Sequence, residues 1–167
     1  MSTGNRLFII LVTLCSCIGW DQATKIFAAR VLRDHAPQHY FANTLRLEYA
    51  ENVGAFLGLG SSLPDSSRWF LLSVGAGALL LGLTLFIYLK HDLTAAETIG
   101  YGLILAGGGS NVLNRIVSGF VVDFLNVGIG GLRTGIFNVA DVSIMVGFTL
   151  VTWCRWARQR QTAVVRI

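Results

Sequence analysis

The stretch Trp69–Leu89, WFLLSVGAGALLLGLTLFIYL, contains no charged residue. An α-helix needs about 20 predominantly apolar residues to cross a bilayer, so this run is long enough for a transmembrane helix. Three further apolar stretches run over about 6–24, 98–113 and 136–153. The sequence therefore predicts an all-α membrane protein with four transmembrane helices at these places.

The composition also indicates a membrane protein with one domain. Hydrophobic residues make up 53% of the 167 residues and charged residues 13%, whereas soluble domains carry about 25% charged residues. A chain of this length ordinarily forms one domain, so we expect residues 1–167 to be a single integral-membrane domain. Glycines at 75, 77, 82 and 107–109 would let the helices approach one another closely.

Basic residues after the last apolar run predict the orientation. Four spans place both termini on one side, and Arg155, Arg158, Arg160 and Arg166 follow the fourth span. A basic segment there is typical of a cytoplasmic anchor facing anionic lipid, and we favour this over nucleic-acid binding. Both termini are therefore expected in the cytoplasm, although Lys and Arg divide almost evenly between the two sides.

The long loop after the first span contains a strand pattern. Leu45, Leu47 and Tyr49 alternate with Arg46 and Glu48, which is the period of a half-buried strand. We predict a small strand-rich flap over about 40–60, lying on the outer membrane surface. The loop NVGIGGLRTG, at 126–135, is rich in glycine and is expected to provide tight turns and mobility.

The cysteines predict neither a disulfide nor a metal site. Cys15 and Cys17 lie two residues apart, so they point to nearly opposite sides of a helix, and Cys154 is in another span. We expect no metal and no cofactor. The run Leu14–Cys17 resembles a lipoprotein cleavage box, so the chain could itself be a lipoprotein precursor. The apolar run continues to Trp20, however, which favours a full transmembrane span.

Two acidic residues lie among apolar neighbours, Asp123 after the third predicted span and Asp141 at the start of the fourth. A charge near the bilayer centre costs at least ~2.5–3.5 kcal/mol, so both are expected at the outer end of a helical hairpin. Two facing carboxylates in a site of low dielectric share one proton, which is the chemistry of aspartic proteases. On spacing alone two alternatives stay open: helix capping, which suits Asp141, and proton transport.

Amides and one guanidinium lie near these acids in the sequence. Asn111 and Arg115 are four residues apart on the third span, and Asn138 is three residues before Asp141. Helical periodicity therefore puts each of these pairs on one face. The other polar neighbours are Asn52, close to Gly54 in the flap, and Asp21 with Lys25, whose i,i+4 spacing predicts an ion pair.

Five short motifs occur in an order similar to one known family. They are DQATK (21–25), ENVGAF (51–56), GGGSNVLNR (107–115), GFVVDF (119–124) and FNVADV (137–142). Each motif alone is weakly specific, but together, on a four-span chain of this length, they are strongly specific. Along nearly its whole length the chain resembles bacterial lipoprotein signal peptidase, also called signal peptidase II.

The resemblance implies a membrane aspartyl endopeptidase of the bacterial inner membrane, with its active site near the outer face. Such an enzyme removes the signal peptide from prolipoproteins, just before the cysteine that carries diacylglycerol. We expect it to work as a monomer in contact with membrane lipid and to be inhibited by the cyclic peptide globomycin. Alternatives are a small transport or proton-relay protein and an inactive prolipoprotein-binding paralogue.

The resemblance also assigns roles to particular residues. Asp123 and Asp141 match the catalytic pair, while Asp21 and Lys25 match a motif that we interpret as structural. The positions that line or support the substrate site are matched by Asn52, Gly54, Asn111, Arg115, Asn138 and Ala140.

The sequence departs from the family at two places on the third span. The family commonly reads Gly-Asn-x-x-Asp-Arg, whereas this chain has Ser110 and Asn114 in place of the Gly and the Asp. Arg115 therefore loses its usual neighbouring counter-ion, and we expect it to use another acceptor, Asp21 or a backbone carbonyl.

Overall fold

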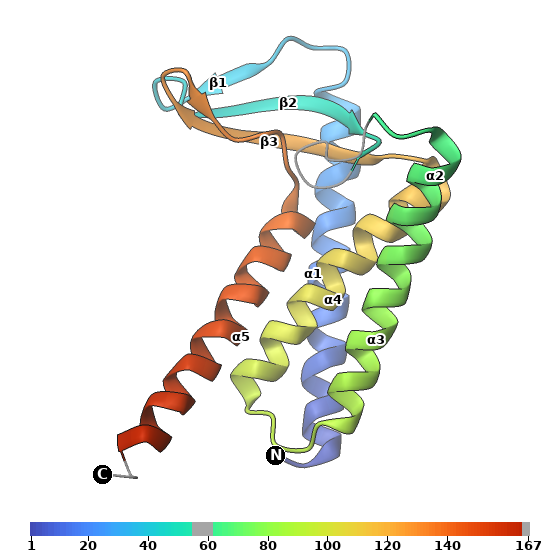
Figure 1. The fold of residues 1–167 in the computed structure, drawn as a ribbon. Helices are drawn as coiled ribbons and strands as arrows, with labels where there is room; N and C mark the ends of the chain where they lie inside the picture. Colours follow the sequence, from blue (N-terminus) through green and yellow to red (C-terminus); the bar gives the residue numbers. More distant parts are fainter. Residues whose placement is uncertain (55–61, 165–167) are drawn as a thin grey trace.

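The computed structural model of the chain describes residues 1–54 and 62–164 and consists of a helical bundle with a sheet across one end (Figure 1). The helices are α1 (Thr3–Val31), α2 (Asp65–Trp69), the π-helical η2 (Phe70–Gly75), α3 (Ala76–Leu89), α4 (Ala95–Ser118) and α5 (Val139–Val164). The strands are β1 (Gln38–Tyr40), β2 (Leu45–Asn52), β3 (Val121–Ile129) and β4 (Leu132–Arg133).

Three helical segments of the described residues are long and apolar enough to cross a membrane: Thr3–Val31, Asp65–Leu89 and Val139–Gln161. They correspond to three of the four predicted spans. The first two segments contain the predicted residues, whereas α5 begins at Val139, three residues after the predicted start, and continues past the predicted end. Their outward faces carry exposed apolar side chains, such as Phe8, Leu79 and Phe148, as expected for contact with lipid. The third predicted span is α4, which is less apolar because glycine and polar residues occupy its buried faces.

Helix α4 packs against the other three long helices through its glycines. A Cβ on Gly107 would lie 2.3 Å from the carbonyl oxygen of Ala140 in α5. A Cβ on Gly108 would lie 2.7 Å from Leu80 Cδ2 in α3, and one on Gly102 would lie 3.1 Å from Thr13 Cγ2 in α1. The predicted close approach is thus confirmed at Gly107 and Gly108.

The other predicted glycine contacts are wrong. Among the described residues, a Cβ at Gly77, Gly82 or Gly109 would meet nothing within 4 Å, and one at Gly75 would meet only its own helix, at an ordinary 3.7 Å. Those four positions therefore do not hold helices together.

The four strands form one antiparallel sheet in the order β1-β2-β3-β4. Strand β2 confirms the strand pattern predicted in the flap, and residues 55–60 of that flap lie outside the described residues. The loop predicted for 126–135 is wrong over the residues of β3 and β4, and the sheet makes the all-α description too narrow. Gly130 and Gly131 form the expected turn, and Gly130 has a φ of 58°.

Polar contacts join the helices at the end opposite the sheet. Thr94 and Glu97 form a capping box at the start of α4, and Arg158 Nη2 donates to the buried Glu97 Oε2 at 2.6 Å. The basic residue Arg155 also faces Glu97. Part of the arginine cluster therefore links α5 to α4, while Arg166 lies outside the described residues.

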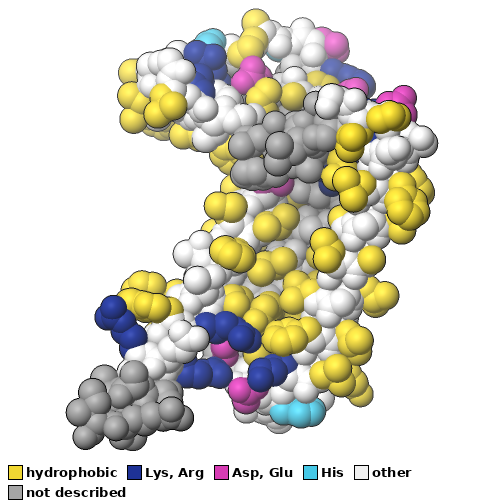
Figure 2. Space-filling model, in the orientation of Figure 1, with side chains coloured by type: hydrophobic (Ala, Val, Ile, Leu, Met, Phe, Trp, Pro, Cys, Tyr) yellow, Lys and Arg dark blue, Asp and Glu magenta, His cyan; other side chains and the backbone are white. Residues whose placement is uncertain are grey.

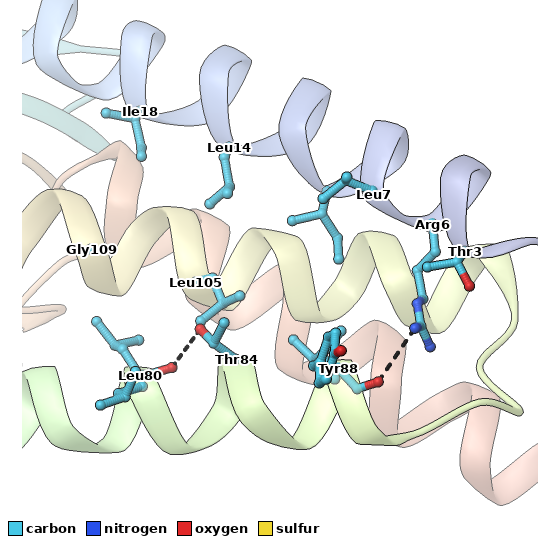
Figure 3. A pocket seen from close by; sticks show the side chains of 13 residues that line it. Thr3, Arg6, Leu7, Leu14, Ile18, Leu80, Thr84, Tyr88, Leu105 and Gly109 are labelled. Carbon is cyan, nitrogen blue, oxygen red and sulfur yellow. Dashed lines mark hydrogen bonds between the residues drawn. The ribbon is translucent and has the colours of Figure 1, made fainter.

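A groove of about 600 Å³ lies between α1 and α3 at this same end (Figure 3). Its walls are apolar, with Leu7 and Leu14 from α1 and Leu80 from α3. Arg6 closes one end, where its guanidinium donates to the backbone carbonyls of Lys90 and Tyr88. Neither Asp123 nor Asp141 lines this groove.

Candidate active site

Asp123 lies on β3, where the sheet crosses the end of the bundle, and is 2% exposed. Its two oxygens each accept a hydrogen bond from an amide: Oδ2 from Asn52 Nδ2 at 2.8 Å and Oδ1 from Asn138 Nδ2 at 2.6 Å. Burial, supported by the nearby charge of Asp141, raises the pKa of Asp123 to about 6, although the two amide donors oppose this shift. The site can therefore hold a proton at mildly acid pH.

Asp141 lies in the first turn of α5 and forms a reciprocal cap with Asn138. The Asn138 backbone N–H donates to Asp141 Oδ2 at 3.1 Å, and the Asp141 backbone N–H donates to Asn138 Oδ1 at 3.0 Å. Its other oxygen, Oδ1, accepts from Asn111 Nδ2 at 2.9 Å. Capping and a chemical role are therefore compatible for this carboxylate.

Asn138 connects the two acids. Its backbone contacts Asp141, while its side-chain amide donates to Asp123 and, at 3.3 Å, to Asn111 Oδ1. Asn138 is 0% exposed, so water does not compete for these bonds. The predicted convergence of both acids with Asn52, Asn111 and Asn138 is thus confirmed by direct contacts.

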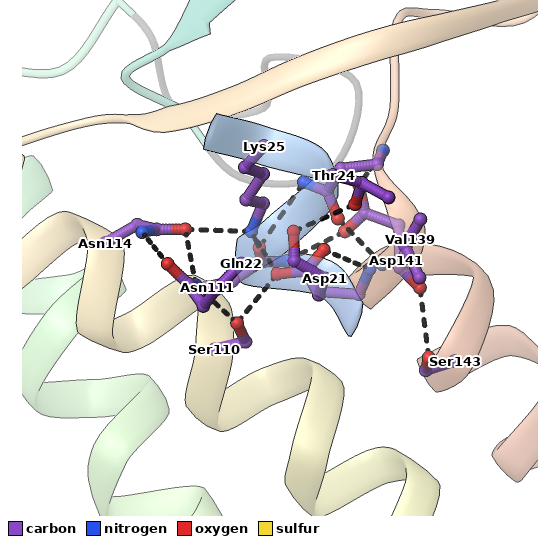
Figure 4. Close-up of polar contacts among 12 residues, drawn as sticks. Asp21, Gln22, Thr24, Lys25, Ser110, Asn111, Asn114, Val139, Asp141 and Ser143 are labelled. Carbon is purple, nitrogen blue, oxygen red and sulfur yellow. Dashed lines mark hydrogen bonds and ion pairs between the residues drawn. The ribbon is translucent and has the colours of Figure 1, made fainter. Parts of the chain in front are cut away.

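The predicted ion pair between Lys25 and Asp21 is confirmed, with 2.7 Å between Nζ and Oδ2, and it lies within the same network of polar contacts (Figure 4). Lys25 Nζ also donates to Asn111 Oδ1 at 2.7 Å. Asp21 Oδ1 accepts from the Ala140 backbone N–H at 2.8 Å, so it ties α1 to the first turn of α5. Both charges are buried, which suits the structural role expected for them.

The two departures from the family motif contact one residue that sequence reasoning missed, Gln22. Gln22 Nε2 donates to Ser110 Oγ at 2.6 Å, and Asn114 Nδ2 donates to Gln22 Oε1 at 3.2 Å. Ser110 Oγ in turn donates to Asp21 Oδ2 at 2.7 Å, and Asn114 Oδ1 accepts from Lys25 Nζ at 2.8 Å. Gln22 lies three residues before Lys25 in the motif DQATK, and this helical spacing could have indicated that Gln22 shares a face with Lys25.

Arg115 does not pair with its neighbour Asn114. Its Nη2 donates to the Gly54 backbone carbonyl at 2.8 Å, so the expected backbone acceptor is confirmed and Asp21 is not the partner. The Gly54 N–H in turn donates to Asn52 Oδ1 at 2.9 Å. Arg115 therefore fixes the end of β2, and with it Asn52, beside Asp123.

A groove of about 320 Å³ opens beside this network. Its polar end is formed by Asn111, Arg115 and Asp141, and its walls are apolar. The remaining lining residues are Leu72, Ala76, Gly108, Val112, Ile144 and Met145. This shape suits a ligand with an apolar body and a polar group that lies against Asp141.

Comparisons with known proteins agree with these features. Residues 13–157 match the family described as Signal peptidase (SPase) II. The lipoprotein signal peptidase of Burkholderia ambifaria (strain MC40-6) is 32% identical over 141 residues, which cover 84% of this chain and 83% of that protein. The protein of the same name from Burkholderia multivorans (strain ATCC 17616 / 249) is 31% identical over the same shares.

Solved structures show the same fold. One bacterial membrane enzyme determined by the in meso method superposes with a TM-score of 0.77 at 23% identity, covering 94% of this chain and 90% of the other. A second gives a TM-score of 0.71 at 24% identity, covering 91% and 92%. The motifs, the converging acids and the match over residues 13–157 together show that the chain belongs to the signal peptidase II family of aspartic peptidases.

Proposed function

We propose that this protein removes signal peptides from diacylglyceryl-modified prolipoproteins, cutting just before the lipidated cysteine, with Asp123 and Asp141 as its catalytic pair. One observation carries this assignment of residues. Both acids accept hydrogen bonds from Asn138, Asp141 from its backbone N–H and Asp123 from its side-chain amide, and Asp141 lies at the polar end of an apolar groove. A lipid-bearing peptide needs an apolar place for its chains and a polar place for its scissile bond.

The proposed reaction starts with one proton on the pair. The N-terminus of α5 favours negative charge on Asp141, while Asp123 holds the proton because burial raises its pKa to about 6. Asp141 takes a proton from water as the water oxygen bonds to the scissile carbonyl carbon, and Asp123 gives its proton to the carbonyl oxygen.

The tetrahedral intermediate then breaks down by the reverse transfers. Asp141 donates its new proton to the leaving nitrogen as the C–N bond breaks, and Asp123 recovers a proton from the intermediate's hydroxyl group. The products are a signal peptide with a free carboxyl group and a lipidated cysteine with a free amine. The pair ends with one proton, as it began.

The surrounding residues hold this geometry in the proposal. Asn52 and Asn138 orient Asp123 by their amides, and Asn111 orients Asp141. Arg115 and Gly54 lie beside the substrate groove, and the Ala140 backbone joins Asp21. Asp21 and Lys25 act as structural supports rather than as reacting groups.

We further propose a four-span topology for a single domain over residues 1–167. At 1.5 Å per residue, the 24 residues of α4 extend about 36 Å, enough to cross the hydrocarbon core. The arginines of α5 favour cytoplasmic termini, and in this proposed topology the sheet and the acids lie at the outer face of the inner membrane. The working form is a monomer, and globomycin is expected to inhibit it by occupying the groove beside Asp141.

Cleavage of a purified diacylglyceryl-modified precursor tests the assignment. Asp123→Asn and Asp141→Asn should each reduce cleavage to background while the protein still accumulates. Asp65→Asn makes the same change at an exposed carboxylate that pairs with Arg68, three residues away, and it should keep full activity. Full activity in either dyad variant would exclude this catalytic pair.

The two rival functions give different results with the same protein. A proton-relay protein would show flux across sealed vesicles that depends on Asp123 or Asp141, and no cleavage in detergent. An inactive paralogue would bind the precursor without forming product, even at high protein concentration.

A further inference from the structure

The free end of the sheet carries large apolar side chains that the described parts of the chain leave uncovered. Phe41 is 79% exposed, Ile129 81% and Leu132 84%. Phe41 belongs to the turn between β1 and β2, and the other two flank the turn between β3 and β4. Figure 2 shows hydrophobic side chains gathered at this end of the sheet. Such a concentration marks an interaction surface.

The pairing of the strands puts the apolar residues on one face. Tyr40 is opposite Leu45, Leu45 is opposite Val127, and Ile129 is opposite Leu132. Because side chains alternate along a strand, Asp123 lies on the same face as Val127 and Ile129. Asp123 is turned toward the start of α5, where it contacts Asn138, so the face with Val127 and Ile129 is the one turned toward the N-terminus of α5.

Toward the free end, the opposite face is polar. His39 is opposite Arg46, and Arg46 is opposite Asn126. Arg133 also contacts Asn126, through a bond from Nε to Oδ1. The free end therefore has one apolar face and one polar face, whereas nearer the bundle Phe124 on the second face is buried against Ala28 and Leu32 of the α1 end.

The free end projects sideways beyond the start of α5 (Figure 1). Close to that start, α5 carries exposed apolar side chains at Val142, Met145 and Val146, which lie on one of the helices long and apolar enough to cross a membrane. The apolar face of the sheet thus continues the apolar outer surface of the bundle at the level where α5 begins. Lipid covers the helices at this level, so lipid is also what the apolar face of the sheet contacts.

The turn that carries Phe41 has a strained backbone. Phe41, Ala42 and Asn43 all have positive φ, at 51°, 51° and 68°, a region that costs roughly 1–2 kcal/mol per residue outside glycine. Asn43 holds the turn, since its Oδ1 accepts from Arg46 Nε at 2.7 Å and its backbone carbonyl accepts from Arg133 Nη1 at 2.7 Å. Strain that the neighbouring structure maintains commonly marks a functional segment.

We propose that this free end, defined by Tyr40, Phe41, Val127, Ile129 and Leu132, inserts into the lipid interface of the bilayer. The sheet then has two attachments, the bundle at one end and the membrane at the other. Because Asp123 lies on the same sheet, the lipid contact holds this carboxyl group over the first turn of α5. The inference concerns membrane contact and does not depend on peptidase activity.

Site-specific fluorescence in nanodiscs tests the insertion. In a background with Cys15, Cys17 and Cys154 replaced by Ala, single cysteines are introduced by Ile129→Cys and Tyr40→Cys and labelled with an environment-sensitive NBD dye. His39→Cys is the matched control, because it is next to Tyr40 along β1 and on the opposite face. Quenching is measured with nitroxide-labelled phospholipid and with aqueous iodide.

We expect nitroxide lipid to quench the dye at Ile129 and Tyr40 at least twofold more than at His39, and iodide to show the reverse order. Equal iodide quenching at all three sites would overturn the proposal, because the free end would then lie in water. Protection from iodide without quenching by nitroxide lipid would also overturn it, because a protein surface would then cover this end.

Discussion

At the scale of single residues, the proton on Asp123 should control the pH dependence of cleavage. Burial raises the pKa of Asp123 from 3.8 to about 6, so the group loses its proton as pH rises through about 6. We expect kcat/KM, which reports the free enzyme, to fall through that range. The corresponding fall in kcat should lie at higher pH, because bound substrate excludes more water. A pH–rate profile in detergent measures both, and a kcat/KM that only rises across that range would contradict the assignment of the proton to Asp123.

The contacts of Arg115 and Asn114 predict very different sensitivities for these neighbours. Asn114→Asp would give Lys25 a second carboxylate but lose the donor to Gln22 Oε1, so we expect kcat/KM to change by less than about tenfold, or about 1.4 kcal/mol. Arg115→Ala removes the hydrogen bond to the Gly54 carbonyl. Because Gly54 also bonds to Asn52, which contacts Asp123, this variant should lower kcat/KM far more. Turnover and thermal melting of both variants decide this. A large gain in kcat/KM from Asn114→Asp would mean that the natural enzyme is weakened. An unchanged kcat/KM in Arg115→Ala would refute the role of Arg115 in fixing the end of β2.

At the scale of elements, the contact between α4 and α5 depends on the absence of a side chain at Gly107. A Cβ there would lie 2.3 Å from the Ala140 carbonyl oxygen and 2.8 Å from Ile144 Cγ1. Gly107→Ala should therefore separate the helices and lower the free energy of unfolding by about 1–3 kcal/mol. Gly109→Ala is the control, since its Cβ would meet nothing within 4 Å, and it should stabilise α4 by about 0.5–1 kcal/mol. Thermal melting of the two variants in detergent measures the difference, and equal melting temperatures would exclude this packing role for Gly107.

The sequence predicted the helices better than the sheet, for a physical reason. Apolar runs such as Trp69–Leu89 specify a membrane helix by local composition alone. Strand β3 is different, because Asp123 and Asn126 interrupt its apolar pattern and its strand partner β2 lies far away in the sequence. Its structure is set by tertiary pairing, which no local window contains.

The same difference between local and tertiary contacts applies to the candidate site. Helical spacing predicted contacts within one element, such as the pair of Asp21 and Lys25, and the family motifs indicated which polar groups converge. The bridging geometry of Asn138 and the role of Gln22 depend on how separate helices face each other. Those contacts could be found only in three dimensions.

At the scale of the whole molecule, the two ends of the bundle should behave as independent stabilising centres. Glu97 and Asn114 lie at opposite ends of α4, about 26 Å apart along its axis. Lys25→Met breaks a buried ion pair and should cost about 3–5 kcal/mol, and Glu97→Ala removes a cap and the bond to Arg158 for about 1–3 kcal/mol. The double variant should show the sum within about 0.5 kcal/mol. Unfolding measurements on the three variants test this, and a larger deviation would reveal coupling through α4.

The placement of Asp123 on a strand and Asp141 on a helix also affects the biogenesis of the protein. Asn52 and Asp123, which must meet, are 71 residues apart, and long-range pairing of this kind forms late. A newly inserted chain therefore has its helices in the membrane before β2 and β3 have joined, and in that state Asp123 is not yet held beside Asp141. Under the proposed mechanism, the nascent chain is its own inactive precursor, and it acquires peptidase activity only when its folding is complete.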